Sequence, residues 1–79
     1  MHKVILYGTS TCGFCRKARA FFDENHVEYT DIDVGEDQKA AEEIIKRSGQ
    51  MGVPVIDIDG QLVLGFDKPR LAELLGVGV

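Results

Sequence analysis

The stretch KVILYGTSTCGFCRKARAFF, residues 3–22, indicates how this 79-residue chain begins to fold. Its first part, Lys3–Tyr7, is short and mostly apolar, which predicts a buried strand. Residues 8–11 are small and polar, as in a loop. From Gly13 to about Asn25 the apolar residues recur at helical spacing, and the basic residues fall largely between them. The stretch therefore predicts a strand, a short loop and a helix.

A second strand and a second helix follow this unit. Val27–Val34 alternates apolar and polar residues, as a strand does when one of its faces is packed. Asp37 is a suitable N-cap for the next helix, which we expect to end at Ser48-Gly49. The chain thus continues the alternation of strand and helix.

The last third of the sequence predicts a hairpin and a final helix. Val53–Ile58 and Gln61–Leu64 flank Asp59-Gly60, a dipeptide that favours a type I′ hairpin turn. Asp67 is suited to cap the final helix, which has a proline in its first turn and Gly76 at its end.

The predicted element order is β-α-β-α-β-β-α in a single domain over residues 1–79. A right-handed βαβ crossover makes the first two strands parallel, and the hairpin adds two antiparallel strands. The helices then cover the faces of the sheet. We expect an α/β fold in which three helices flank a four-stranded mixed sheet.

The composition is that of an ordinary globular domain, with 44% hydrophobic and 28% charged residues. A formal net charge of −4 argues against nucleic acid as the main partner. The longest apolar run near the start, Val4 to Tyr7, is too short for a membrane span or a signal-peptide core. We therefore expect a cytoplasmic protein without a membrane partner, in a compartment where permanent disulfides are rare.

The two cysteines, Cys12 and Cys15, have a spacing that allows a structural disulfide, a metal site or a redox pair. A disulfide that closes so small a ring would contribute only about 2 kcal/mol, so it is a poor structural bond. A closed zinc site needs four ligands, and His2 and His26 are remote in sequence. We expect no metal site within one chain, while a cluster shared by two subunits stays open.

The helix start favours the redox interpretation. Free N–H groups and the helix dipole stabilise an anion at Cys12, whereas Cys15 is expected to be less exposed and protonated. This difference predicts that Cys12 attacks a substrate disulfide and that Cys15 resolves the mixed disulfide. Gly13 leaves the backbone open to a partner, and Phe14 is expected to face that partner.

Val53-Pro54 is a second candidate for the site. A proline at a strand start removes a donor from the ladder, so it fits an edge, a strand start or a special turn. The sequence leaves open whether the peptide bond is cis or trans. If it is cis, the Val53 backbone can lie near Cys12 and bind an extended substrate.

Three segments together resemble the glutaredoxin family of the thioredoxin superfamily. They are the cysteine pair after the first strand, Val53-Pro54, and Gly65-Phe66-Asp67 after the hairpin. The likeness spans Val4 to about Leu75, in the same order of elements.

The resemblance implies a thioredoxin fold and the activity of a thiol–disulfide oxidoreductase. It also implies a cis Pro54, with Cys12 as the nucleophile and Cys15 as the resolving thiol. The implied substrate groove has Val53 on one side and the segment Gly65, Phe66 and Asp67 on the other.

Several positions depart from the pattern of glutaredoxins that use glutathione. They are Thr9 where a lysine is common, Gly13-Phe14 in place of Pro-Tyr, Gly52 before Val53, and Leu64 and Phe66 around Gly65. Each change trims contacts to glutathione. The Gly-Phe pair is similar to that of glutaredoxin-like redoxins, which reduce ribonucleotide reductase and are recharged by thioredoxin reductase.

A second resemblance gives the alternative function. Cys-Gly-Phe followed by serine is typical of monothiol glutaredoxins that share a 2Fe–2S cluster between subunits, with glutathione as a ligand. Cys15 stands in place of that serine and restores dithiol chemistry. We expect a monomer without a bound cofactor that reduces protein disulfides and draws electrons from thioredoxin reductase or glutathione. A glutathione-dependent 2Fe–2S carrier, formed as a bridged dimer, is the alternative.

Overall fold

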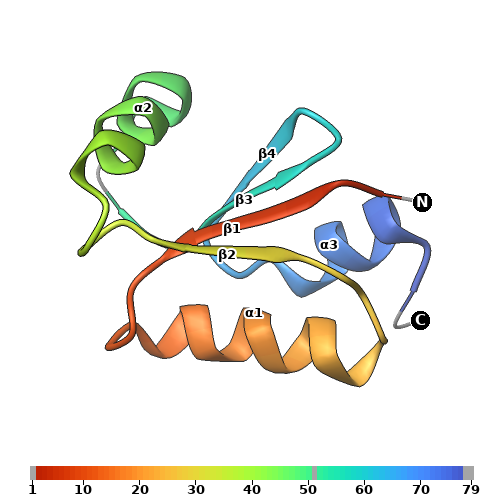
Figure 1. Cartoon of the computed structure of the whole chain (residues 1–79). Helices are drawn as coiled ribbons and strands as arrows, with labels where there is room; N and C mark the ends of the chain where they lie inside the picture. The colour runs from red at the N-terminus through yellow and green to blue at the C-terminus, as the bar shows by residue number, and fades with distance from the viewer. Residues whose placement is uncertain (1, 51, 78–79) are drawn as a thin grey trace.

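The computed structural model describes residues 2–50 and 52–77, which fold into the predicted order of elements (Figure 1). In chain order they are β1 (Val4–Gly8), α1 (Gly13–Glu24), β2 (Thr30–Asp33), α2 (Gln38–Ser48), β3 (Val55–Ile58), β4 (Gln61–Leu64) and α3 (Lys68–Leu75). Within the described residues no helix has the length and apolar character needed to cross a bilayer.

The strands form one mixed sheet in the order β2-β1-β3-β4. β1 runs parallel to β2, with Leu6 opposite Asp31, and antiparallel to β3, with Leu6 opposite Ile56. β3 and β4 are antiparallel neighbours. Helices α1 and α3 lie on one face of the sheet and α2 lies on the other (Figure 1). The predicted α/β arrangement is confirmed.

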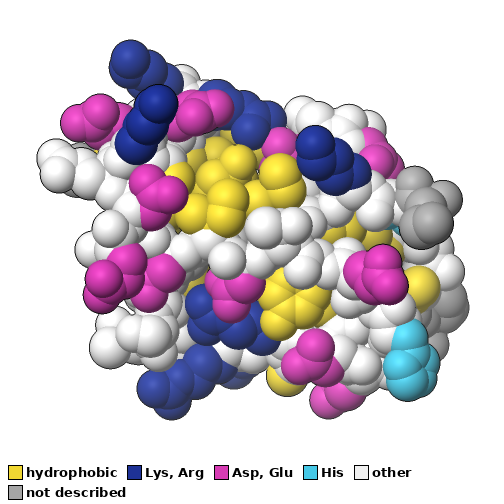
Figure 2. Space-filling view, in the orientation of Figure 1, with side chains coloured by type: hydrophobic (Ala, Val, Ile, Leu, Met, Phe, Trp, Pro, Cys, Tyr) yellow, Lys and Arg dark blue, Asp and Glu magenta, His cyan; other side chains and the backbone are white. Residues whose placement is uncertain are grey.

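The core is divided by the sheet because alternate residues of a strand point to opposite faces. The main cluster of buried residues lies on the side of α1 and α3 and comprises Val4, Leu6, Ala18, Phe21, Phe22, Ile56, Ile58, Val63, Leu71 and Leu75. A smaller cluster of Tyr7, Ile44 and Val55 lies on the side of α2. Hydrophobic side chains gather at the surface beside α2, so this helix covers only part of its face (Figure 2).

The predicted helix caps and hairpin turn are confirmed. Asp37 and Asp67 are the N-caps of α2 and α3, and each side chain accepts a backbone N–H of the first turn. Gly49 and Gly76 end these helices in the left-handed conformation. Asp59-Gly60 has φ values of 52° and 92°, as a type I′ turn requires.

The predicted strand Val27–Val34 was too long, since β2 covers only Thr30–Asp33. The chain is still leaving α1 at this point, because the Val27 N–H donates to the Phe22 carbonyl at 2.8 Å. Val27 and Tyr29 instead pack against the main core. Their apolar character reflects that packing and not a place in the sheet.

Two other boundaries also differ from the prediction. Gly8, expected in the loop, is the last residue of β1 and pairs with Asp33. β3 begins at Val55 and not at Val53. Pro54 has no N–H to give to a ladder, which accounts for the later start.

Candidate active site

The end of β1 and the start of α1 place the two cysteines. β1 ends at Gly8, residues 9–11 form the connection, and α1 begins at Gly13. Cys12 is the N-cap of this helix, and Cys15 lies in its first turn. The two sulfurs are therefore held at the point where the helix has free N–H groups.

The Cys12 sulfur is partly exposed and accepts a hydrogen bond from the Cys15 N–H at 3.3 Å. Its thiol also lies 3.8 Å from the Val53 carbonyl oxygen. Burial by itself raises the pKa of this thiol, but hydrogen bonds from the Cys15 thiol and backbone outweigh it. The Phe14 N–H and the charge of Arg19 act in the same direction as those bonds. The pKa of Cys12 consequently lies below its usual value.

The Cys15 thiol has the opposite environment. It is completely buried, with 0% of the residue exposed. Burial, and then the hydrogen bond with the Cys12 sulfur, raise the pKa of Cys15 to about 11. The backbone of Thr9 and the charge of Arg19 oppose this rise only in part. The structure thus has the difference in exposure and protonation that the helix start predicted.

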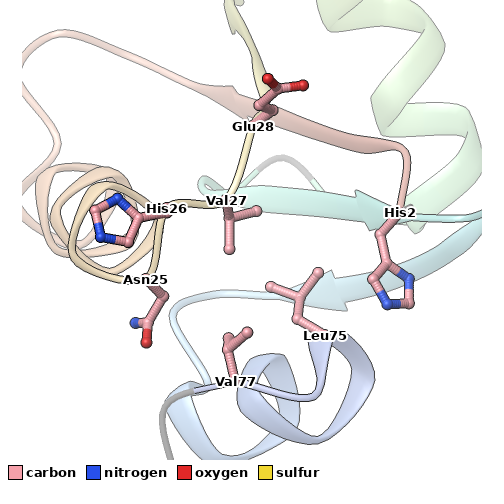
Figure 3. A pocket seen from close by; sticks show the side chains of 7 residues that line it. All are labelled: His2, Asn25, His26, Val27, Glu28, Leu75 and Val77. Carbon is pink, nitrogen blue, oxygen red and sulfur yellow. The ribbon is translucent and has the colours of Figure 1, made fainter.

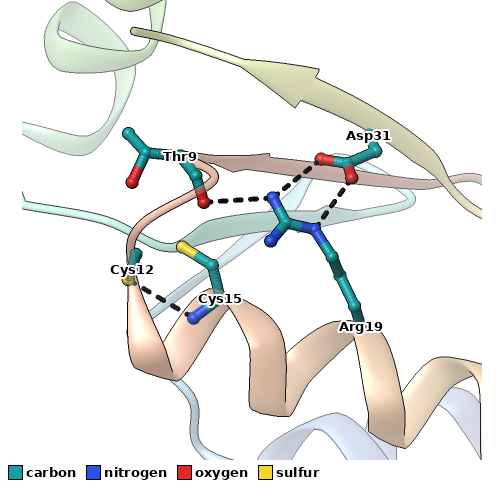
Figure 4. A network of polar contacts seen from close by, with 5 residues as sticks. All are labelled: Thr9, Cys12, Cys15, Arg19 and Asp31. Carbon is teal, nitrogen blue, oxygen red and sulfur yellow. Dashed lines mark hydrogen bonds and ion pairs between the residues drawn. The ribbon is translucent and has the colours of Figure 1, made fainter.

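Arg19 carries a polar network beside the cysteines (Figure 4). Its guanidinium donates to both carboxylate oxygens of Asp31, at 2.8 and 3.2 Å, and to the Thr9 carbonyl at 3.3 Å. The network joins α1 to β2 and to the loop before Cys12. Arg19 was not predicted from the sequence as a site residue. Its spacing of four from Cys15, which places both on one helix face, is the signal that points to it.

The Val53–Pro54 peptide bond is cis, which resolves the choice that the sequence left open. Val53 is half-buried, with its carbonyl near Cys12, and Pro54 is buried. The Pro54 carbonyl accepts the Gly65 N–H at 2.8 Å. Cys12 and Val53 are 41 residues apart in sequence, and they therefore meet at the end of the sheet where β1 leads into the cysteine loop.

The residues of the segment after β4, Gly65, Phe66 and Asp67, each have a structural role. Gly65 has a φ of 77°, in the region that favours glycine. Phe66 is half-buried and packs edge-on against Phe21, with ring centroids 6.2 Å apart. The Asp67 carboxylate accepts the Arg70 N–H at 3.2 Å and caps α3. The contribution of these residues to substrate binding stays a prediction.

Phe14 is a large hydrophobic side chain at the surface, with 58% of the residue exposed. The Lys17 ammonium lies 5.3 Å from the centroid of its ring, one turn along α1. Phe14 therefore faces outward and presents an apolar ring next to a positive charge, while its contact with a partner stays a prediction.

A pocket of about 340 Å³ lies elsewhere in the molecule (Figure 3). Its lining residues are His2, Asn25, His26, Val27, Glu28, Leu75 and Val77, none from the cysteine loop. The two histidines stand on separate sides of the pocket (Figure 3). In the described part of the chain, no three His, Cys, Asp or Glu side chains form a metal-binding group. The pocket is thus separate from the site that the two cysteines define.

The fold and the cysteine pair define a class, namely small thioredoxin-like proteins with two cysteines at the start of the first helix. A crystal structure of a mutant of the thioredoxin-like protein BC3987 superposes with a TM-score of 0.90 and 29% identity. That alignment covers 99% of this chain and 100% of the other.

Sequence comparison identifies the family within this class. Residues 4–63 match the glutaredoxin family, and the chain belongs to that family. A glutaredoxin-like 8.6 kDa protein of the rubredoxin operon of Clostridium pasteurianum is 37% identical, over 89% of this chain and 93% of the relative. Glutaredoxin 3 of Escherichia coli is 36% identical, over 85% of this chain and 81% of its own. Thiol–disulfide redox chemistry is the general function of this family.

Proposed function

We propose that this chain is a dithiol oxidoreductase that reduces protein disulfides, with Cys12 as the nucleophile and Cys15 as the resolving thiol. The observation that carries the proposal is the contrast between two sulfurs one helical turn apart. The pKa of the partly exposed Cys12 is lowered, whereas burial first, and then Cys12, raise the pKa of Cys15.

In the first step the Cys12 thiolate attacks one sulfur of the substrate disulfide. A bond forms between Cys12 and that sulfur, the substrate S–S bond breaks, and the other sulfur leaves as a thiolate that takes a proton from water. The lowered pKa of Cys12 raises the fraction of thiolate at neutral pH. The raised pKa keeps Cys15 protonated, so it does not compete in this step.

In the second step Cys15 gives up its proton, which the leaving substrate sulfur finally takes up, and attacks the Cys12 sulfur. The Cys12–Cys15 bond forms, and the second substrate sulfur leaves and is protonated. The substrate has then gained two electrons and two protons, and the cysteine pair has lost them. Reduction of the Cys12–Cys15 bond by a second partner then restores the starting state.

The proposed substrate groove lies around the exposed Cys12 sulfur. Phe14 and the Val53 backbone flank that sulfur, and the hydrogen bond from Gly65 to Pro54 holds the segment Gly65-Phe66-Asp67 nearby. A Cβ placed on Gly13 would meet no atom within 4 Å, which supports close approach of a partner at this position. We propose that an extended segment of a disulfide-bearing protein binds here.

For the electron source we propose thioredoxin reductase in preference to glutathione. Position 9 holds a threonine where glutaredoxins that use glutathione commonly have a lysine, and this argues against tight binding of glutathione. The Gly13-Phe14 pair argues in the same direction. Ribonucleotide reductase is the proposed type of target, and a monomer in the cytoplasm is the proposed state. The test compares recycling of the oxidised protein by thioredoxin reductase with NADPH and by glutathione with glutathione reductase. Faster recycling by glutathione would refute this choice of reductant.

The oxidoreductase itself is tested by iodoacetamide labelling of the fully reduced protein, with mass spectrometry to locate the label. We expect Cys12 to react at least about tenfold faster than Cys15 at pH 7, because only its thiolate is accessible. The same protein unfolded in urea is the control and should label equally at both positions. Equal rates in the folded protein would contradict the proposed roles.

A colour measurement separates the alternative from this proposal. A 2Fe–2S carrier purified without air would absorb in the visible range and would bind glutathione. The dithiol oxidoreductase should be colourless and should reduce insulin disulfides with dithiothreitol as the electron source. A coloured protein inactive towards insulin would favour the carrier.

A further inference from the structure

Arg19 and Cys15 lie on consecutive turns of α1, and their side chains rise from the helix to the level of Thr9 and Asp31 (Figure 4). The arginine is held there at three points, two on the Asp31 carboxylate and one on the Thr9 carbonyl. Its side chain is only 21% exposed. These hydrogen bonds hold the positive charge of the guanidinium in one place. Because the guanidinium group is rigid and planar, it loses little conformational entropy when it forms them.

Gly8 shows how close this charge is to the buried sulfur. A Cβ built on Gly8 would lie 2.6 Å from the Cys15 sulfur and 3.7 Å from an Arg19 guanidinium nitrogen. Because both distances start from one point, the sulfur and the nitrogen lie within about 6 Å, a range in which an opposite charge favours the ionised form. Gly8 has no side chain, and the Cys15 sulfur occupies the position that a Cβ there would need.

We propose that Arg19 is a positioning residue for the resolving step, whose clamped guanidinium stabilises Cys15 as a thiolate when it attacks the mixed disulfide. This inference rests on the proposed function. The step needs help of this kind, because Cys15 is fully buried and a buried anion is costly. Cys12 cannot supply it, since its sulfur is neutral once bound to the substrate.

Arg19 is the positive group that acts on the Cys15 thiol, and two neighbouring groups modify its field. Asp31 on β2 binds the guanidinium and cancels part of its field. Tyr29, in the segment before β2, also interacts with Arg19, and burial, first of all, raises its pKa, so it is neutral at pH 7. The charge of Arg19 lowers the pKa of both cysteines, in agreement with the geometry.

The test isolates the resolving step with dithiobis(nitrobenzoate). Cys12 attacks the reagent and releases one coloured nitrothiobenzoate, and Cys15 then attacks the Cys12 sulfur and releases the second. Stopped-flow absorbance records both phases from pH 6 to 10. The variants are Arg19→Gln, which removes the charge, Arg19→Lys, which keeps it, and Lys3→Gln. Lys3 directly precedes β1 and is therefore at the opposite end of the strand from Gly8. Lys3→Gln changes the net charge as Arg19→Gln does, but far from the Cys15 sulfur, so it is the control.

We expect Arg19→Gln to slow the second phase at pH 7 by roughly threefold to tenfold. Loss of the charge reduces the thiolate fraction, and the greater nucleophilicity of a more basic thiolate recovers part of that loss. The pH at which the second phase is half-maximal should move upward in Arg19→Gln and back in Arg19→Lys. It should stay unchanged in Lys3→Gln.

The outcomes separate this inference from the proposed function. An unchanged pH midpoint in Arg19→Gln would overturn the role of Arg19, whatever happens to the rate. Equal midpoints for Arg19→Gln and Arg19→Lys would overturn it too, because the charge would then not matter. Failure of the unmodified protein to release a second nitrothiobenzoate would instead contradict the dithiol function itself. Thermal unfolding of each variant shows which of them are folded.

Discussion

The start of α1 and the space beneath the end of β1 are neighbouring regions that treat the same functional group in opposite ways. At the helix start, the Cys12 sulfur is partly exposed and accepts a backbone N–H. Beneath β1, the Cys15 sulfur is sealed from water next to Gly8. One helical turn is thus enough to give two thiols different pKa values, because hydrogen bonding favours an anion and burial opposes it.

The largest expected effect comes from removing either sulfur. Cys12→Ser should abolish reduction of insulin, because a serine hydroxyl is not ionised at neutral pH and cannot start the exchange. Cys15→Ser should still form the first bond and accumulate mixed disulfides with protein substrates, visible on a non-reducing gel. If Cys12→Ser accumulated the mixed disulfides instead, the roles of the two regions would be reversed.

The next largest expected effect is a loss of stability at high pH that ionisation of the Cys15 thiol causes. The folded thiol keeps its proton up to a pKa of about 11, because burial and then the bond with Cys12 raise it. An unfolded thiol ionises near about 8.5. Stability from this group is therefore complete below that pH and is lost as pH rises to the folded value, by roughly 3 kcal/mol.

Urea unfolding of the reduced protein between pH 8 and 11 measures this loss. The Cys15→Ser variant is the matched control and should lose less stability over that range. Burial, as its main cause, also raises the pKa of Tyr29, which contributes in the same direction and remains in both proteins. Parallel curves for the two proteins would show that Cys15 is not protonated in the way described.

A pair of glycine substitutions compares the two regions by packing. In Gly8→Ala the new methyl group would lie 2.6 Å from the Cys15 sulfur, whereas at Gly13 it would meet nothing within 4 Å. Gly8→Ala should destabilise the protein by about 1–3 kcal/mol and slow release of the second nitrothiobenzoate. Gly13→Ala should stabilise α1 by up to about 1 kcal/mol. Equal free energies of unfolding would mean that the space beneath β1 is not tight.

The smallest expected effect concerns the exposed side of the site. Phe14→Ala should raise KM for a protein disulfide by about fivefold or less, equivalent to roughly 1 kcal/mol. The melting temperature should hardly change, because the ring is 58% exposed. Lys17, which lies over the ring, provides a second variant, Lys17→Gln, with the same expected direction. A large loss of stability in Phe14→Ala would place this side chain in the fold and not at the partner surface.

Much of the fold could be predicted from the sequence, because its signals are local. Asp37 and Asp67 cap helices through atoms three residues away, and Asp59-Gly60 forms its turn by its own conformational preferences. The location of Cys12 at a helix start follows from the order of strand, loop and helix. Such features depend on few atoms outside the segment that contains them.

The features that were missed depend on contacts between distant segments. The apolar Val27 and Tyr29 suggested a longer strand, but they pack on the core beside the exit of α1. The bond between Arg19 and Asp31 joins residues 12 apart, and spacing cannot reveal it. The buried Asp57 on β3 likewise forms an ion pair with Arg47 on α2, with 2.9 Å between a guanidinium nitrogen and a carboxylate oxygen. An alternating pattern shows which face of a strand is apolar, but it does not show which charged residue of another element pairs with the polar residues of that strand.

The N-cap role of Cys12 has a practical consequence. The sulfur that reacts is also the acceptor for the Cys15 N–H, and an anionic sulfur is a stronger acceptor than a neutral one. The amide proton of Cys15 is thus a native reporter of the oxidation state of its neighbour. Its NMR resonance should shift with each conversion of that sulfur, so turnover can be followed by spectroscopy without a dye or a tag.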